Sequence, residues 1–141
     1  MFFKANEGNQ VNKVERLYIF EITFATGMQV VKIGKSSGSS SLDRMLSIQR
    51  DYYHKYRTTF LCRIKRDRVV EKGVFQKETE LHNFFKEFQY RPKAAFDGST
   101  ELFCVPLDSA VEAYEWILDG NSLDDYEYEL PESEPEDQLP F

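Results

Sequence analysis

The sequence predicts one small α+β domain followed by an acidic C-terminal tail. Three observations predict it: two β-type runs near the N-terminus, later segments whose apolar residues recur with helical spacing, and a final stretch with neither pattern. A length of 141 residues suits one compact domain with an appendage, and 41% hydrophobic residues are enough for a core. We divide the chain into a loose arm over 1–13, a domain over 14–119 and a tail over 120–141.

The first part of the domain is predicted to be an antiparallel hairpin. Strand-forming residues fill 16–24 and resume over 30–33, and a short connection containing Gly27 separates them. A polar, serine-rich loop over 36–41 follows, and a helix is expected over 42–50.

The buried face of that helix is expected to carry four residues: Leu42, Met45, Leu46 and Gln49. Arg44 lies off this face, and an arginine in such a place is usually a solvated charge.

Four more elements are expected along the rest of the domain. They are a strand over 58–64, a long helix over about 69–89, a short strand over 101–105 and a last helix over 108–118. The long helix gathers its apolar residues on one side when each position advances by ~100°.

Charge is divided unevenly along the chain. The net charge is −6, yet residues 119–141 hold nine acidic residues and no Lys or Arg, whereas residues 13–93 hold 17 basic against nine acidic residues, a net of +8. The basic body suits contact with phosphates, and the tail would be repelled by them. No apolar run approaches the length needed to cross a bilayer, so no membrane partner is expected.

Two cysteines, Cys62 and Cys104, lie in apolar, strand-like segments. We expect two buried thiols rather than a disulfide or half of a metal site, because a structural zinc site usually has four ligands. This cysteine usage, and N-terminal residues without the apolar core of a signal peptide, suit a reducing, cytoplasmic location.

Glu78 is the most informative titratable residue. It lies about 60° from the centre of the apolar stripe on the long helix, with His82 one turn further along the same edge. A carboxylate beside a buried face must be paired, hydrogen-bonded or metal-bound. His82 is expected to be a packed, hydrogen-bonded partner rather than a ligand, and Glu80, which projects away from the stripe, a surface charge.

The hairpin contributes Tyr18 and the segment Lys32-Ile33-Gly34-Lys35. Taken alone, Tyr18 is a half-buried core tyrosine and the lysines are ordinary charges. Gly34 would permit a turn or a close backbone approach that a Cβ would block.

In this order the residues resemble the GIY-YIG nuclease superfamily. The segments are L-Y-I-F, V-V-K-I-G-K-S, D-R-M-L-S-I-Q, K-E-T-E-L-H-N-F-F and T-E-L-F, within about residues 16–105. They are most similar to the phage and bacterial branch that has K-I-G in place of Y-I-G, so a phage-encoded protein is expected. The resemblance implies a three-stranded antiparallel sheet flanked by helices and a one-metal hydrolysis of DNA phosphodiesters.

The resemblance also implies roles for four residues. Tyr18 matches the tyrosine that activates the attacking water, and Lys32 takes the place of the second tyrosine. Arg44 matches the arginine that stabilises phosphate charge, and Glu78 matches the metal ligand. A free tyrosine, with a pKa near ~10, is a poor base, so a neighbouring lysine or a metal-bound hydroxide network would need to assist it. A single carboxylate completed by waters and phosphate oxygens suits Mg²⁺ or Mn²⁺.

The candidate DNA contacts are Lys35 and Ser36 at the end of the hairpin, and Lys55 and Arg57 further on. The last two belong to an aromatic and basic insert that begins at Asp51. Its tyrosines either stack on splayed bases or pack over the sheet edge.

The tail is spaced by prolines, lacks helical periodicity and is expected to be disordered. Its last residues, Leu139, Pro140 and Phe141, follow acidic residues and resemble the terminal tip of bacterial single-stranded DNA-binding proteins, and loosely a sliding-clamp-binding peptide. A replication or repair protein is therefore a candidate partner. Two other interpretations stay open: a solubilising tail, and an autoinhibitory one that mimics phosphates on the basic surface.

Two functions follow from these observations. The first is a Mg²⁺- or Mn²⁺-dependent DNA endonuclease, favoured by the joint presence of Tyr18, Arg44 and Glu78. The second is a non-catalytic DNA- or protein-binding module on the same scaffold, favoured by Lys32 and by the acidic tail.

Overall fold

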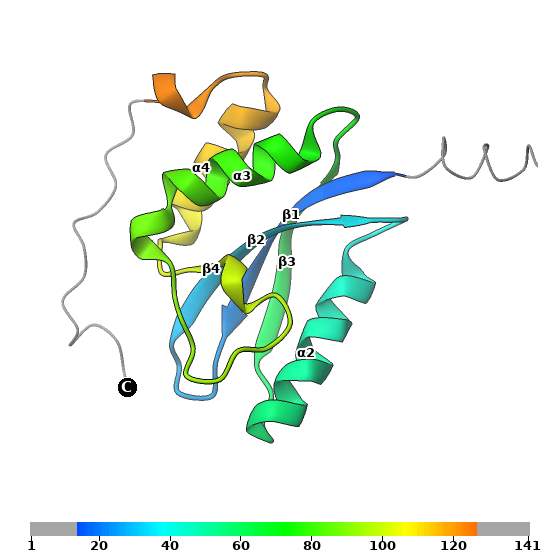
Figure 1. Ribbon diagram of the computed structural model, residues 1–141, viewed down its shortest axis with the longest axis vertical. Helices are drawn as coiled ribbons and strands as arrows, with labels where there is room; N and C mark the ends of the chain where they lie inside the picture. The colour runs from blue at the N-terminus through cyan, green and yellow to red at the C-terminus, as the bar shows by residue number, and fades with distance from the viewer. Residues whose placement is uncertain (1–13, 127–141) are drawn as a thin grey trace, which may run out of the picture.

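A four-stranded antiparallel sheet lies between helices in the computed structural model, which describes residues 14–126 (Figure 1). The strands are β1 (Glu15–Thr23), β2 (Gln29–Ser37), β3 (Leu61–Val69) and β4 (Leu102–Phe103), in the order β3-β1-β2-β4. The helices are α2 (Leu42–Tyr56), α3 (Val74–Phe84) and α4 (Leu107–Leu118). Short 3₁₀ turns occupy Lys86–Phe88, Ser99–Glu101 and Leu123–Asp125. The α+β class is confirmed.

The expected three-stranded sheet is wrong by one strand. β4 is antiparallel to β2 and pairs with it at Val31 and Lys32 alone. The sequence does predict this short strand, over 101–105, but the resemblance assigns it no place in the sheet. The rest of that edge of β2 is not covered by β4, and α3 packs beside it.

The β1–β2 hairpin is confirmed, and β2 is longer than expected. Tyr18 pairs with Gly34 and Phe20 pairs with Lys32, and the ladder continues to Ser37 rather than stopping at Gly34. Gly34 is therefore a residue within a strand and not the end of one.

β3 is displaced along the sequence from its predicted range of 58–64. The structure extends the strand to Val69, across four charged residues that the prediction left outside it, Lys65, Arg66, Asp67 and Arg68. An edge strand tolerates such charges because its side chains reach partners at the rim of the sheet. Here Arg66 and Arg68 both donate to Glu115 of α4 at 2.8 Å, and Asp67 accepts from Arg16 at 2.9 Å.

The long helix expected over 69–89 is too long at both ends. Gly73, with a φ of 74°, precedes the first residue of α3, and a separate 3₁₀ turn follows the helix. Apolar periodicity alone does not distinguish a helix from a helix flanked by a strand and a turn.

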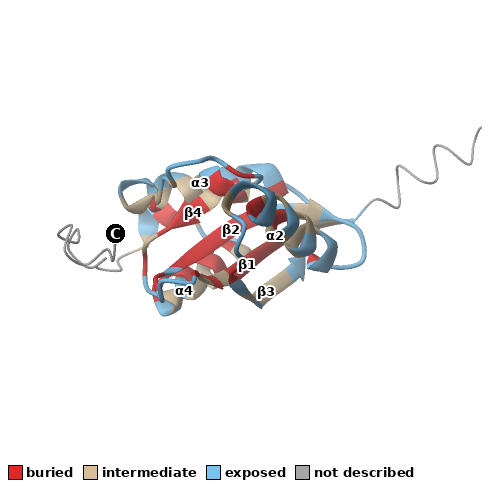
Figure 2. Cartoon of the chain, turned by 90° about the horizontal axis from the view of Figure 1, so that it is seen from below, coloured by how far each residue is buried: buried red, intermediate tan, exposed pale blue. Residues whose placement is uncertain are grey.

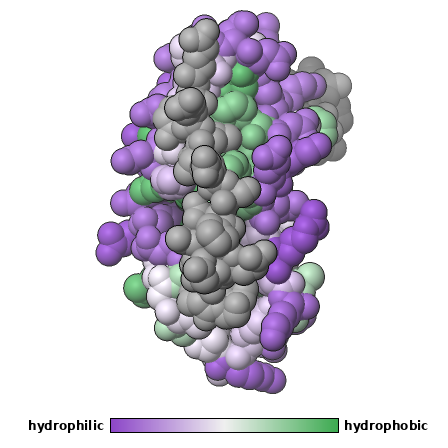
Figure 3. Space-filling view, turned by 90° about the vertical axis from the view of Figure 1, so that its left-hand side faces the viewer, coloured by the Kyte–Doolittle hydropathy of each residue, from purple (hydrophilic) through white to green (hydrophobic). Residues whose placement is uncertain are grey.

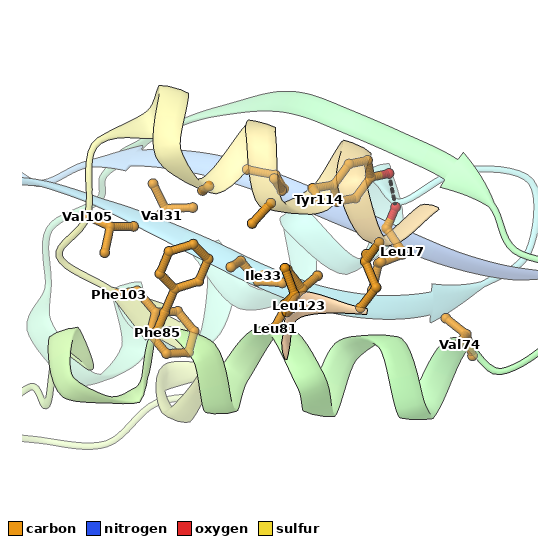
Figure 4. Packing of buried hydrophobic residues seen from close by; sticks show 14 of the residues in the cluster. Leu17, Val31, Ile33, Val74, Leu81, Phe85, Phe103, Val105, Tyr114 and Leu123 are labelled. Carbon is orange, nitrogen blue, oxygen red and sulfur yellow. Dashed lines mark hydrogen bonds between the residues drawn. The ribbon is translucent and has the colours of Figure 1, made fainter. Parts of the chain in front are cut away.

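The central strands of the sheet consist mostly of buried residues, drawn red in Figure 2, and a hydrophobic core lies on each face of the sheet. Successive residues of β1 and β2 point to opposite faces, so each strand supplies two cores. One core lies under α3 and α4 and includes Leu17, Ile33, Leu81, Phe85 and Tyr114, whose hydroxyl donates to the Leu17 carbonyl at 2.7 Å (Figure 4). The other lies under α2 and includes Tyr18, Phe20, Ile22, Ile48, Tyr52 and Phe60.

The predicted buried face of α2 is wrong for two of its four residues, since Leu42 and Leu46 are each 44% exposed. Met45 and Gln49 are half-buried, and the fully buried residues of this helix are Ile48 and Tyr52. The helix is rotated about its axis relative to the expectation. Arg44, four residues before Ile48, therefore lies beside the buried face instead of in solvent.

The aromatic insert mainly packs against the rest of the protein. The Tyr52 ring stacks on Tyr56 with centroids 4.5 Å apart and meets Phe60 and Phe96 edge-on. Tyr53 is 48% exposed and remains available at the surface. The packing interpretation is thus correct for Tyr52 and Tyr56.

The packed chain continues past residue 119, where the sequence analysis expects the tail to start. Leu123 is buried in the core under α3 and α4. Glu80, expected to be a surface charge, is half-buried and accepts from the backbone N–H of Leu123 at 2.7 Å. The candidate partner-binding residues Leu139, Pro140 and Phe141 lie outside the described residues.

Both cysteines are free and half-buried, and burial raises the pKa of Cys62 to about 12. None of the helices within residues 14–126 is both long and apolar enough to cross a membrane. On the side of the molecule shown in Figure 3, the surface of the described residues is mostly hydrophilic, with one narrower hydrophobic band.

Candidate active site

Tyr18 and Lys32 form a buried pair at the centre of the candidate site. They lie on neighbouring strands, and both side chains are fully buried on the α2 side of the sheet. Lys32 Nζ donates to the Tyr18 hydroxyl at 2.9 Å and forms an ion pair with Glu101. A buried ammonium is costly unless it is paired and hydrogen-bonded, and these two partners provide both.

Gly34 leaves the space in which this pair sits. A Cβ built on Gly34 would lie 2.5 Å from the Tyr18 hydroxyl oxygen and 2.9 Å from Oε1 of Glu101. The sequence prediction that Gly34 permits a close approach is confirmed, and the approaching groups are two side chains of this chain.

Glu78 reaches the site from α3, along the edge of β2 that β4 leaves uncovered. It is 5% exposed, and its Oε2 is buried without a hydrogen-bond partner. Burial and the neighbouring Glu101 carboxylate raise the pKa of Glu78 to about 7, although the charges of Lys35 and Lys32 oppose the rise. A buried carboxylate oxygen without a hydrogen bond can bind a cation or a proton.

His82 fixes α3 against the same edge. Its Nε2 lies 2.6 Å from the Ile33 carbonyl oxygen, and its ring contacts Phe103 with centroids 5.3 Å apart. Burial lowers the pKa of His82, so the neutral ring donates Nε2–H to the carbonyl. The predicted role of His82 as a packed, hydrogen-bonded partner is confirmed, and a ring nitrogen that donates a proton here is not a metal ligand.

Arg44 points from the start of α2 toward Tyr18 and is held by Asp97. Its Nη1 lies 2.6 Å from Oδ2 of Asp97, and its Nη2 lies 3.3 Å from Oδ1. Burial lowers the pKa of Arg44, but its hydrogen bond to Asp97 and the field of Tyr18 outweigh burial and raise the pKa. The Arg44 hydrogen bond also lowers the pKa of Asp97. The two groups stay charged and compensate each other.

Gly98 completes the site from the loop before β4. Its φ of 81° suits glycine, and a Cβ there would lie 2.7 Å from Cε of Lys32 and 3.4 Å from Nη2 of Arg44. This loop thus supplies the partners of both site cations, Asp97 for Arg44 and Glu101 for Lys32.

The structure brings together all four predicted catalytic residues, Tyr18, Lys32, Arg44 and Glu78. It does not gather the four predicted DNA contacts in the same way. Lys35 is exposed and acts on Glu78 through its charge, whereas the Ser36 hydroxyl oxygen is buried without a partner.

Lys55 and Arg57 lie at the far end of α2, about 16 and about 20 Å along the helix axis from Arg44 at 1.5 Å per residue. Lys55 Nζ donates to the Ala95 carbonyl at 3.1 Å, and the Arg57 guanidinium lies 5.9 Å from the centre of the Tyr53 ring.

Sequence reasoning missed the roles of Asp97, Gly98 and Glu101. Glu101 belongs to the T-E-L-F segment on which the resemblance partly rests, and its position directly before an apolar strand was the available signal. No comparable signal marked Asp97, whose partner Arg44 is 53 residues away.

Across residues 14–126, no group of three or more His, Cys, Asp or Glu side chains is placed to hold a metal ion. A cation at Glu78 would therefore depend on few protein ligands and on waters, as Mg²⁺ often does.

Comparison with known proteins identifies one family. The model of the T5orf172 domain matches residues 15–118, a range that includes all four strands and the three helices of the described chain. Searches of curated proteins and of solved structures found no significant match. The T5orf172 domain is a GIY-YIG-related domain from phage T5. Because the match covers most of the sequence, and the site residues lie within it, the chain belongs to the T5orf172 domain family.

Proposed function

We propose that this protein is a metal-dependent DNA endonuclease that hydrolyses phosphodiester bonds. One observation carries the proposal: the buried hydrogen bond from Lys32 to Tyr18, with Arg44 and the unpartnered oxygen of Glu78 beside it. A fold needs none of these costly buried polar groups for stability, and such groups cluster at functional sites.

Water activation falls to Tyr18 in this mechanism. Tyr18 would act as the base, with the Lys32 ammonium donating a hydrogen bond to its oxygen, and would accept a proton from the attacking water. The water oxygen then forms a bond to phosphorus while the bond from phosphorus to the leaving oxygen breaks. The leaving oxygen takes a proton from solvent and Tyr18 releases the proton it accepted to solvent, so charge and atoms balance over the cycle.

Arg44 would stabilise the charge that develops on the phosphoryl oxygens. Its guanidinium can present two parallel N–H donors to a phosphate as it does to Asp97. The substrate phosphate would therefore replace Asp97 or share Arg44 with it.

The divalent ion of this mechanism, Mg²⁺ or Mn²⁺, fits the residues present. Glu78 would hold it through the oxygen that lacks a hydrogen bond, and the ion would supply Lewis-acid stabilisation of the phosphate charge.

We further propose that DNA lies along α2. Lys35 near the end of β2, and Lys55 and Arg57 at the far end of the helix, would then contact the phosphate backbone, whereas the predicted contact of Ser36 is not kept because its hydroxyl oxygen is buried. Such contacts position DNA and do not read its sequence.

The deciding experiment is cleavage of supercoiled, linear and single-stranded DNA with Mg²⁺, Mn²⁺ or EDTA, by the wild-type chain and by Glu78→Gln. We expect cleavage by the wild type with a divalent ion, and none with EDTA or by the variant. The control is Glu71→Gln, since Glu71 is exposed. DNA binding with no cleavage under any of these conditions would reject the nuclease and leave the binding module.

A further inference from the structure

Glu101 is the counterion of the most deeply buried cation in the described chain. The Lys32 side chain has no exposed surface, whereas that of Glu101 is 25% exposed. Glu101 uses Oε1 for Lys32 and is placed at this point because the next residue, Leu102, pairs with Lys32 in the sheet. Its carboxylate is thus held at the edge of β2 by both backbone pairing and an ion pair.

A second carboxylate faces the same point from α3. Among the charged groups around Glu78, Glu101 acts on it most strongly. The nearest imidazole nitrogen, Nε2 of His82, lies 3.9 Å from Oε2 of Glu78 and donates its hydrogen bond to the Ile33 carbonyl instead. Neither His82 nor any other described side chain hydrogen-bonds that oxygen.

Only one of the two carboxylates at this edge is in an ion pair with a lysine. Lys32 neutralises Glu101, while the exposed Lys35 acts on Glu78 only through space, without an ion pair between these two described residues. One buried carboxylate remains without a bonded cation. Two carboxylates from different elements, one with an orphaned oxygen, form the kind of oxygen-rich site that Mg²⁺ and Mn²⁺ favour.

We propose that Glu101 is a second protein ligand of the divalent ion, which is held between Glu78 and Glu101. This proposal rests on the proposed function for the assignment of Glu78. Oε1 of Glu101 stays on Lys32, and the other oxygen faces the ion. Glu101 thereby links the ion to Lys32 and, through Lys32, to the Tyr18 hydroxyl.

The test is direct Mn²⁺ binding to the full chain without DNA, measured by electron paramagnetic resonance and calorimetry at pH 8. Loss of a residue that only hydrogen-bonds to a ligand of a metal ion already weakens binding of the ion by ~10–100-fold. We therefore expect Glu101→Gln and Glu78→Gln each to weaken Mn²⁺ binding at least tenfold, and Glu71→Gln to leave it unchanged. Thermal melting checks that each variant is folded.

A pair of variants separates a ligand from a mere counterion of Lys32. Lys32→Met removes the cation that Glu101 neutralises, so Lys32→Met/Glu101→Gln leaves neither member of that ion pair as an unpaired charge. If Glu101 is a ligand, the double variant binds Mn²⁺ at least tenfold more weakly than Lys32→Met. Equal Mn²⁺ binding by these two proteins would overturn the proposal. This comparison is decisive even if the single variant Glu101→Gln does not fold.

The outcomes also separate this proposal from the proposed function. Weak binding by Glu78→Gln with full binding by Glu101→Gln rejects the second ligand and keeps the metal at Glu78. Unchanged binding by both variants, or no binding by the wild type, rejects both.

Discussion

The phenol oxygen of Tyr18 lies 2.9 Å from Nζ of Lys32, and both side chains are fully shielded from solvent. Tyr18→Phe removes one of the two hydrogen-bond acceptors of that ammonium. We expect cleavage to be lost, because the water then has no base. We also expect a loss of stability of about 1–3 kcal/mol, the usual cost of leaving a buried donor unsatisfied. Plasmid cleavage and thermal unfolding measure the two effects.

The control is Tyr53→Phe, which changes an exposed tyrosine of α2. Normal cleavage by a folded Tyr18→Phe protein would show that the base is another group.

Local pattern and charge were enough to predict the hairpin, α4 and the α+β class. The predictions failed where tertiary contacts decide. β3 carries a run of charged residues whose partners, Glu115 and Arg16, lie on other elements of the fold. The rotation of α2 depends on the aromatic core that Tyr52 enters, which no local period encodes.

The candidate site shows the same limit. Tyr18, Lys32, Arg44 and Glu78 were predicted through the order of motifs, and the structure brings them together. Asp97 and Glu101 act as partners of residues 53 and 69 positions away, so their roles could not be read from neighbouring residues.

Arg44→Ala should slow cleavage by about 10²- to 10³-fold, the usual effect of losing one preorganised donor to a transition-state charge. Folding should be little changed, because the lost partner Asp97 is 43% exposed and can be solvated. Cleavage rates at saturating DNA measure the effect. Arg50→Ala, on the same helix at an exposed position, is the matched control. Equal losses in the two variants would mean that general positive charge matters and not the position of Arg44.

Gly34→Val should disturb the Tyr18–Lys32 pair, because even its first side-chain carbon would lie 2.5 Å from the Tyr18 hydroxyl oxygen. Overpacking of a buried site typically costs ~1–3 kcal/mol, and we expect cleavage to fall with it. Gly27→Asn is the control, since Gly27 has open space around it and asparagine tolerates its positive φ. A Gly34→Val protein with wild-type melting temperature and cleavage would show that the close approach is unimportant.

The stability of the metal-free protein should fall as pH rises from about 4.5 to about 7. Burial and Glu101 raise the pKa of Glu78 from 4.5 to about 7, so the folded protein holds this proton more tightly than the unfolded chain does. The associated stability is fully present below the unfolded pKa and is lost as pH rises through the folded pKa.

The difference should amount to roughly 1–3 kcal/mol, and thermal melting of the wild type and of Glu78→Gln in EDTA measures it. The variant should lack this slope. Mn²⁺ should raise the wild-type melting temperature most above pH 7, where Glu78 has lost its proton. A wild-type slope identical to that of Glu78→Gln would mean that Glu78 does not titrate in this window.

The acidic tail offers a test that depends on charge alone. Residues 127–141 contain six acidic and no basic residues, so deleting them changes the net charge from −6 to 0. The deletion starts after Tyr126 because Leu123 belongs to the core. If the tail competes with phosphates for the basic surface, the deletion should tighten DNA binding and steepen its loss with salt. Titration of labelled DNA at several salt concentrations measures both.

Removal of Pro140 and Phe141 alone separates recruitment from this competition. It leaves all six acidic residues in place, so competition with DNA should be unchanged, whereas a partner that docks on an apolar tip should be lost. Changing the six acids to Gln or Asn, with the tip intact, is the reciprocal control. Recruitment predicts that the tip deletion loses the partner and keeps wild-type DNA affinity, and that the neutralised tail keeps at least part of the partner binding. If neither variant nor the full deletion changes DNA affinity, its salt dependence or capture of a replication or repair protein, the tail serves solubility alone.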